Sequence, residues 1–175
     1  MWKTEYRRIK RIGGLIILCI EIIVLVGVSS QCLASSQGKI AFVVKYRDDP
    51  LDIQSDIWVM DADGSNPHPV TNDPFQDWYP CWSPDGTKIA FHSDRSGNVD
   101  IWVINADGSG ARNLTNNPAR DSYPAWSPDS RKIAFASIRY YNPEIYVMNA
   151  DGSNQRNLTN HPARDEMPAW SPVLP

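Results

Sequence analysis

The sequence predicts an all-β fold: a partial β-propeller of about three four-stranded blades, preceded by an N-terminal signal or membrane-anchor segment. The first observation is a 44-residue period, in which Asp-Gly-Ser starts at positions 63, 107 and 151 and Trp-Ser-Pro starts at positions 82, 126 and 170. Such a period indicates a small unit stacked on its copies, because one unit cannot bury its apolar faces alone. The second observation is that short apolar runs alternate with Gly, Pro, Asp and Asn, which are typical turn residues.

One repeat, residues 79–115, shows the strands expected of a blade. Pro84, Asp85 and Gly86 form a strong turn signal after the first apolar run. The predicted strands follow in order: Tyr79–Trp82, Lys88–Ser93, Asp100–Ile104 and Ala111–Thr115. Pro80 belongs to the first strand, and proline is tolerated at the edge of a sheet. The first strand is therefore placed at the inner edge of the blade, facing the central channel.

The strand count by phase divides the repeat region, residues 39–175, into the blade parts 40–71, 79–115, 123–159 and 167–170. The second and third parts are whole blades, while the first has only the last three strands of a blade and the fourth only its first strand. The two ends are thus complementary, but three blades are fewer than the usual four to eight. Two interpretations stay open: the chain is a piece of a longer propeller, or two chains form a homodimer that completes a six-bladed ring.

Residues 1–38 differ in composition from the rest. A basic start is followed by an apolar run over Leu15–Val28 and then by small residues, which is the shape of a secretory signal. Glu21 interrupts the apolar run and is costly in lipid. Cleavage after Ala34 and an uncleaved anchor in the inner membrane at residues 12–28 both stay open. The basic end stays in the cytoplasm in either case, so the repeat region is expected to be periplasmic or otherwise extracytoplasmic.

The composition of the repeat region limits the partners it can have. It contains 12 Lys and Arg against 18 Asp and Glu, a net charge of about −6. It has no basic stripe, so nucleic acid is not an expected partner. Cys81 stands where the later repeats have Ala125 and Ala169, and it is expected to be a small buried residue outside any disulfide framework.

Several motifs recur in register, and together they resemble a known family. Trp-Ser-Pro-Asp-Gly-x-Lys-Ile-Ala-Phe, Asp-Ile-Trp-Val-x-Asn-Ala-Asp-Gly-Ser and Asn-Leu-Thr-Asn are similar to the TolB-type β-propeller repeat, a WD-like repeat, and the resemblance covers residues 39–172. Envelope binding proteins share this repeat with the propeller domains of prolyl-oligopeptidase-like enzymes. The resemblance therefore implies a fold more specifically than a function. TolB itself also has an α/β domain before a six-bladed propeller.

Three aspartates recur in the loop that enters each first strand: Asp77, Asp121 and Asp165. Loops at this position gather at one mouth of a propeller channel, so the carboxylates are candidates for a ligand-binding rim that holds a cation or a basic peptide. Arg120 and Arg164 precede two of them and would give the rim alternating charges. The alternative is that each aspartate accepts hydrogen bonds from nearby backbone amides and only fixes the turn.

The first repeat carries an insertion. Phe42 and Ile57 are 15 positions apart, whereas the matching residues of the later repeats are 10 apart. The longer loop contains three further candidate ligand-binding residues: Arg47, Asp48 and Asp49. Insertions in repeat proteins often mark the binding face, and a neutral insertion is the alternative.

No catalytic residue, metal ligand or cofactor is predicted from the sequence. His68, His92 and His161 occupy non-equivalent repeat positions, and there is no Gly-x-Ser-x-Gly elbow. The Asp61–Asn66 loop is better explained as a hairpin turn than as a calcium loop, because its twelfth position is Asn72 rather than Glu.

These observations favour an exported, non-enzymatic propeller that binds a protein or peptide in the cell envelope through loops on a rigid scaffold. Two alternatives stay open. The chain is a remnant of the propeller domain of a prolyl-oligopeptidase-like hydrolase, or it is a carbohydrate-binding propeller that uses aromatic residues such as Trp78, Tyr140 and Tyr141.

Overall fold

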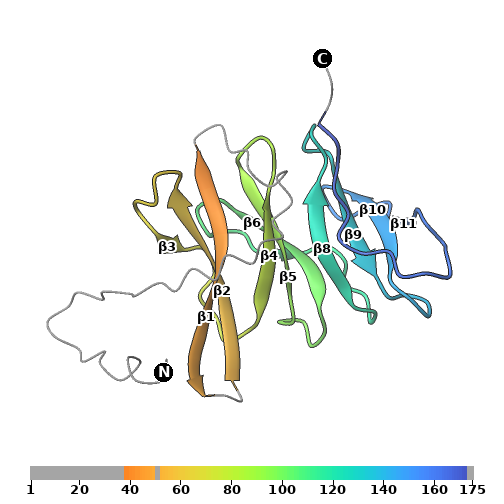
Figure 1. Ribbon diagram of the computed structural model, residues 1–175, viewed down its shortest axis with the longest axis horizontal. Coiled ribbons are helices and arrows are strands. Elements are labelled where there is room, and N and C mark those ends of the chain that lie inside the picture. The colour runs from red at the N-terminus through yellow and green to blue at the C-terminus, as the bar shows by residue number, and fades with distance from the viewer. Residues whose placement is uncertain (1–37, 50–51, 173–175) are drawn as a thin grey trace, which may run out of the picture.

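The computed structural model describes residues 38–49 and 52–172, which form three antiparallel sheets and no helix. The sheets stand side by side in chain order, as neighbouring blades do (Figure 1). The prediction of an all-β, partial propeller is confirmed. In the described part of the chain, no helix is long and apolar enough to cross a membrane. The signal or membrane anchor is predicted within residues 1–38, with the anchor at 12–28, and residues 1–37 of this segment lie outside the described residues.

The middle sheet shows how one repeat folds. Its strands are β4 (Asp77–Trp82), β5 (Lys88–Ser93), β6 (Asp100–Asn105) and β7 (Arg112–Asn113). The predicted turn after β4 is present: the amide of Gly86 donates to the Ser83 carbonyl at 2.8 Å, and Gly86 has a φ of 70°. β4 is an edge strand whose register is irregular around Pro80, which suits a residue without an amide hydrogen.

The third sheet repeats this pattern. Its strands are β8 (Asp121–Trp126), β9 (Lys132–Ser137), β10 (Glu144–Asn149) and β11 (Arg156–Asn157). Ser130 occupies the place of Gly86, donates its amide to the Ser127 carbonyl at 2.9 Å and has a φ of 58°. The two complete blades therefore share one backbone conformation although a turn residue differs.

The first sheet contains only three strands: β1 (Lys39–Asp49), β2 (Asp52–Asp61) and β3 (His68–Pro69). They correspond to the last three strands of a blade, as the sequence predicts for residues 40–71. In a complete blade a first strand pairs with the strand that β1 represents. Among the described residues no strand pairs with that edge of β1.

Apolar side chains fill both spaces between neighbouring sheets. Trp126 is 6% exposed and belongs to the cluster between the second and third sheets, with Phe135 and Ile101. Trp82 is 3% exposed and belongs to the corresponding cluster between the first and second sheets. The 44-residue period predicts that Trp82, Trp126 and Trp170 are equivalent core or inter-blade residues. The structure confirms this for Trp82 and Trp126, whereas Trp170 is only half-buried, because among the described residues no further blade covers it. Cys81 is also buried, as expected. Burial of such large apolar side chains drives the stacking of the blades.

The glycine of each later Asp-Gly-Ser turn lies against the preceding blade. Gly108 has a φ of +83°, and a Cβ atom added there would lie 2.9 Å from the carbonyl oxygen of Val70. At Gly152, with a φ of +88°, such an atom would lie 2.7 Å from the carbonyl oxygen of Leu114. Glycine is therefore needed twice over at these positions, for the turn and for the close approach of the next blade.

Residues 167–170 are predicted to be the first strand of a further blade, but they form no strand. The reason is that a strand needs a hydrogen-bonded neighbour, and the described chain has none beside this segment. The backbone nevertheless follows the earlier first strands, because the φ of Met167 is 56°, close to 53° at Tyr79 and 57° at Tyr123. The indole of Trp170 donates to a carbonyl of β8 at 3.0 Å. This side-chain contact ties the segment to the third blade although no described strand pairs with its backbone.

Candidate functional site

A buried aspartate begins the first strand of each complete blade and is paired with an arginine. Asp77 is 0% exposed, and its two oxygens accept hydrogen bonds from Nη2 of Arg95 at 2.8 and 2.7 Å. Asp121 is also 0% exposed, and its Oδ2 accepts from Nη2 of Arg139 at 3.1 Å. Burial raises the pKa of both carboxyl groups, and hydrogen bonds from a serine and from the arginine oppose that shift. Each pair therefore ties a first strand to its own blade.

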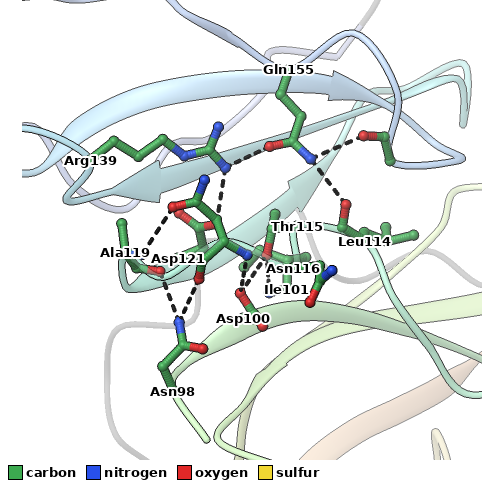
Figure 2. A network of polar contacts seen from close by, with 12 residues as sticks. Asn98, Asp100, Ile101, Leu114, Thr115, Asn116, Ala119, Asp121, Arg139 and Gln155 are labelled. Atoms are coloured by element: carbon green, nitrogen blue, oxygen red, sulfur yellow. Dashed lines mark hydrogen bonds and ion pairs between the residues drawn. The ribbon is translucent and has the colours of Figure 1, made fainter. Parts of the chain in front are cut away.

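A polar network connects the second and third blades and fixes the loop between them (Figure 2). Arg139 lies between Asp121 and Gln155, and Gln155 donates from Nε2 to the carbonyl of Leu114 at 3.0 Å. Asn98 donates to the carbonyl of Ala119 at 3.0 Å. These contacts hold the loop that leads into β8. This loop carries the exposed residue Arg120.

An open cavity of about 480 Å³ lies where the second blade meets the first strand of the third. Its size is within the range of ligand sites in proteins. We call it the aromatic cavity, and it is lined by Gln76, Trp78, Tyr79, His92, Asp94, Val99, Arg120 and Tyr123. These residues come from β4, β5 and β8 and from the loops at their ends. Half of the lining thus lies on strands, and the other half lies in the loops directly beside them.

Three rings of the aromatic cavity contact one another. Tyr79 and Tyr123 meet edge to face, with centroids 4.6 Å apart and planes at 83°. The His92 ring lies 5.1 Å from Tyr79 and 5.8 Å from Tyr123. Both tyrosines have positive φ at the register irregularity of their strands, and such irregularities re-aim side chains. Tyr79 remains 46% exposed, so the cluster offers a rigid apolar surface with polar hydroxyl groups.

His92 is electrically neutral in this environment. It is 4% exposed, and burial together with the charge of Arg120 lowers its pKa from 6.5 to about 3. Its Nδ1 accepts a hydrogen bond from the amide of Tyr123 at 3.4 Å. Since a catalytic base works best when its pKa is near the working pH, this histidine is a poor base at neutral pH. The cavity is better suited to binding than to acid–base chemistry.

The structure separates the residues predicted to form a charged rim. Arg120 is exposed and lines the aromatic cavity. Asp77 and Asp121 lie buried against their arginines, so their side chains do not stand on an exposed rim. The alternative, that these aspartates only accept hydrogen bonds from backbone amides, is also incomplete. Their charged partners are the side chains of Arg95 and Arg139. Each of these arginines follows its aspartate by 18 residues. This separation is too long for a pairing to be inferred from local turn motifs.

The remaining candidates lie elsewhere. Asp165 is half-buried, and its amide donates to the Pro143 carbonyl at 2.9 Å, a contact that matches the position of Asp121 in the preceding blade. Arg164 is exposed and pairs with Glu166 at 2.7 Å. Three candidates of the insertion belong to β1, but their side chains lie outside the described part of the structure: Arg47, Asp48 and Asp49.

Tyr79, Tyr123 and His92 are cavity residues that the sequence patterns do not single out. One signal exists, because the 44-residue period places Tyr79, Tyr123 and Met167 at equivalent positions. A repeated large side chain in a strand is usually explained as core, so the signal alone does not indicate a site. The irregular register of the first strands, which brings the rings into the cavity, cannot be predicted from periodicity.

Solved structures with a similar fold include two TolB proteins. The chain is 27% identical to TolB from Acinetobacter baumannii, with a TM-score of 0.61, over 70% of this chain and 31% of that one. It is also 27% identical to a protein described as TolB from Agrobacterium tumefaciens, with a TM-score of 0.57, over 67% of this chain and 44% of that one. The chain therefore spans less than half the length of either relative.

A third similar structure is the β-propeller domain of the Trilobed protease from Pyrococcus furiosus, which has an open velcro topology. It is 17% identical, with a TM-score of 0.54, over 73% of this chain and 41% of that one, and at this identity only the fold is shared. No curated protein matches the chain. Residues 35–173 match the family described as the TolB beta propeller domain. Because this match spans most of the sequence, the chain belongs to the TolB beta propeller domain family.

Proposed function

We propose that this chain is an exported, non-enzymatic propeller that binds a protein or peptide in the cell envelope, and that the aromatic cavity is its contact surface. The observation that carries the proposal is the composition of that cavity. Trp78, Tyr79 and Arg120 line it and are at least partly exposed. Tyrosine, tryptophan and arginine contribute most of the binding energy in protein interfaces.

The charges of the cavity indicate the kind of peptide that fits. Asp94 Oδ1 already accepts a hydrogen bond from the backbone amide of Gln76 at 2.9 Å, so one of its carboxylate oxygens has a partner. Arg120 is the basic residue of the lining and is exposed. An apolar or aromatic side chain against Tyr79, followed by an acidic group for Arg120, is the matching ligand chemistry.

Two observations support an extracytoplasmic location. The N-terminal sequence has a basic start followed by an apolar run, which is typical of export. The family to which the chain belongs includes envelope binding proteins of the TolB type. Both observations support the same compartment, in which a peptide-binding module of this kind meets envelope proteins.

The test is binding of the full-length chain to a peptide array and a glycan array, with two matched variants. Tyr79→Asn removes a ring of the cavity, and asparagine tolerates the positive φ at this position. Tyr141→Asn is the control, because Tyr141 is fully exposed and does not line the cavity. We expect peptides with an apolar and an acidic residue to bind, with a roughly tenfold weaker affinity in Tyr79→Asn and no change in Tyr141→Asn.

Other outcomes would favour the alternatives. Glycan binding that depends on Tyr141 but not on Tyr79 would support the carbohydrate-binding propeller. Cleavage of the bound peptides by the purified chain would support the hydrolase alternative. Peptide binding that is equally strong in both variants would place the contact surface outside the aromatic cavity.

We also propose that the outer face of the third blade is covered by a second copy of this chain, as part of a six-bladed ring. The observation is a difference between equivalent residues. Val70 and Leu114 are 7% and 6% exposed because the next blade covers them, whereas Leu158 at the same repeat position is 48% exposed. Within the described residues, segment 167–170 and one edge of β1 have no partner strand. The two are complementary, so two chains can exchange them.

Light scattering of the full-length chain tests this association. A mass of two chains, reduced toward one chain by Leu158→Asp, is the expected result, because a charge at the covered position is costly to bury. Arg112→Asp on the exposed strand β7 is the control for an added acidic residue. A well-folded monomer at all concentrations would contradict the homodimer and favour a longer propeller, in which further blades of the same chain cover this face.

A further inference from the structure

Three carboxylate groups meet where the first and second blades join. One carboxylate oxygen from each of Asp56, Asp73 and Asp77 lies within 4.8 Å of the other two. Asp56 and Asp77 are buried, and Asp73 is half-buried, so the group is reachable from one side. Calcium binds oxygen ligands at about 2.3–2.6 Å, so two ligands of one ion lie at most about 5 Å apart. The spacing of the three groups meets this condition.

Asp56 is the unusual member of the group. It is 1% exposed, and its Oδ2 is buried without a hydrogen-bond partner among the described residues. Its Oδ1 has only long contacts, with Thr71 Oγ1 and the amide of Asp73, both at 3.4 Å. A buried carboxylate oxygen that lacks a donor is strongly disfavoured. A bound cation would supply the missing partner.

The second repeat shows the same position with its partners present. Asp100 takes the place of Asp56 and is equally buried, with 1% exposure. Its Oδ2 accepts hydrogen bonds from Ser96 Oγ at 2.6 Å and from Asn113 Nδ2 at 2.7 Å. The backbone of the repeat therefore does not require an unpartnered carboxylate at this position.

Two substitutions between the repeats contribute to the difference. Pro69 stands where the second repeat has Asn113, so the side-chain amide donor is missing. Asp73 stands where the second repeat has Asn117, so a third carboxylate is added at the same place. Both changes make the first junction poorer in donors and richer in negative charge, which is the direction that favours a hard cation.

Arg95 neutralises only part of this charge. Its Nη2 lies 3.1 Å from Asp73 Oδ2 and 2.7 Å from Asp77 Oδ2. No hydrogen bond or ion pair joins Arg95 to Asp56 in the described structure. Three ionised carboxylates against one guanidinium leave two negative charges, and each carboxylate oxygen can bind two partners. A divalent cation matches that remainder.

We propose that Asp56, Asp73 and Asp77 bind one calcium ion at the junction of the first two blades. Asp56 provides its unpartnered Oδ2, and Asp73, on the open side, is the entry to the site. Thr71 Oγ1 is the neighbouring neutral oxygen, and water completes the 6–8 ligands that calcium takes. The ion joins three elements: strand β2, the loop that follows β3, and strand β4. It therefore stabilises the contact between the first two blades.

The test is calcium titration of the full-length chain, freed of divalent ions, by calorimetry and by thermal unfolding. We expect one ion per chain, with a dissociation constant of about 10⁻⁴–10⁻³ M as in other extracellular modules, and a rise in Tm with calcium. Asp73→Asn should weaken binding by about tenfold or more. This variant has the asparagine of the second repeat, so it is expected to fold. Asp107→Asn removes an exposed carboxylate of a turn and is the control that should bind as the parent chain does.

Two results would overturn the site. One is the absence of binding heat and of a Tm shift at several millimolar calcium. The other is a shift that magnesium reproduces equally and that Asp73→Asn retains, because this would be a general effect of divalent ions on an acidic surface. Loss of calcium binding in Asp56→Asn, with unfolding still cooperative, would support the site independently of Asp73.

Discussion

The two junctions between blades use the same backbone positions with different chemistry. At the second junction, Asp100 is satisfied by neutral donors, and one arginine serves one buried aspartate. At the first junction, Asp56 lacks such donors, and Arg95 serves two carboxylates. The apolar clusters beside the two polar networks are alike. The comparison teaches that the same apolar stacking of blades is compatible with different polar networks at the two junctions.

The largest expected effect concerns the part that both junctions share. Trp126→Ala should lower the free energy of unfolding by about 3–5 kcal/mol, because a nearly fully buried indole is lost and a cavity remains. Trp82→Ala should cost a similar amount at the first junction. Chemical denaturation of both variants measures this. A loss below about 1 kcal/mol at either position would mean that this indole is not part of the stacking core.

The next effect concerns the arginines. Arg95→Met should lower the free energy of unfolding by about 3 kcal/mol, because it leaves the buried Asp77 and the adjacent Asp73 without their cation. Arg139→Met should cost less, because only Asp121 loses a charged partner. Adding Asp77→Asn to Arg95→Met should recover part of the loss. Equal stability of the single and double variants would show that the burial of an unpaired charge is not the cause.

Replacing the equivalent buried aspartates Asp56 and Asp100 by asparagine should change the free energy of unfolding in opposite directions. Burial, together with repulsion from Asp77 and Asp73, raises the pKa of Asp56 from 3.8 to about 6. Ionised Asp56 therefore destabilises the fold at neutral pH, and Asp56→Asn in calcium-free buffer should stabilise it by about 1–3 kcal/mol. Asp100→Asn should instead destabilise, because hydrogen bonds to a charged acceptor are lost. Thermal unfolding at pH 7 with a chelator compares them, and a destabilised Asp56→Asn would contradict the assignment.

Per pH unit, the smallest effect is a pH dependence in the second blade. The pKa of His92 is about 3 in the fold and 6.5 as its ordinary value, so the unfolded chain binds the proton more tightly. Stability should therefore fall as pH decreases from 6.5 toward 3, by about 1 kcal/mol per pH unit. Asp56 acts in the opposite sense, because its raised pKa means that stability falls as pH rises from about 4 to about 6. The His92 contribution is best measured in the Asp56→Asn variant.

Comparison with His92→Gln in that background isolates the histidine. The equivalent position of the third blade is Ala136, so the repeat itself does not need an ionisable group there. The slope of unfolding free energy against pH between 4 and 6 should flatten in the double variant. An unchanged slope would show that His92 is protonated in the fold.

The local features of the fold were predictable because they depend on neighbouring residues. The turn at Ser83–Gly86, the edge position of Pro80 and the buried tryptophans all follow from residue types at a fixed period. The strand expected at residues 167–170 did not form, because pairing depends on a neighbour that local sequence cannot provide. Burial at Leu114 and exposure at Leu158 differ for the same reason.

The sequence by itself determined the repeat, the strand order within a blade and the equivalence of Trp82 with Trp126, since period and turn chemistry are local properties of the chain. Only the tertiary structure decided which polar residues meet. Asp56 and Asp77 are 21 positions apart, and Tyr79 and Tyr123 are 44 apart, and each pair comes together because adjacent blades stack. The physical reason is that contacts between charges and between rings depend on distance in space. The stacking of blades sets this distance, and the local sequence of each strand contains no information about it.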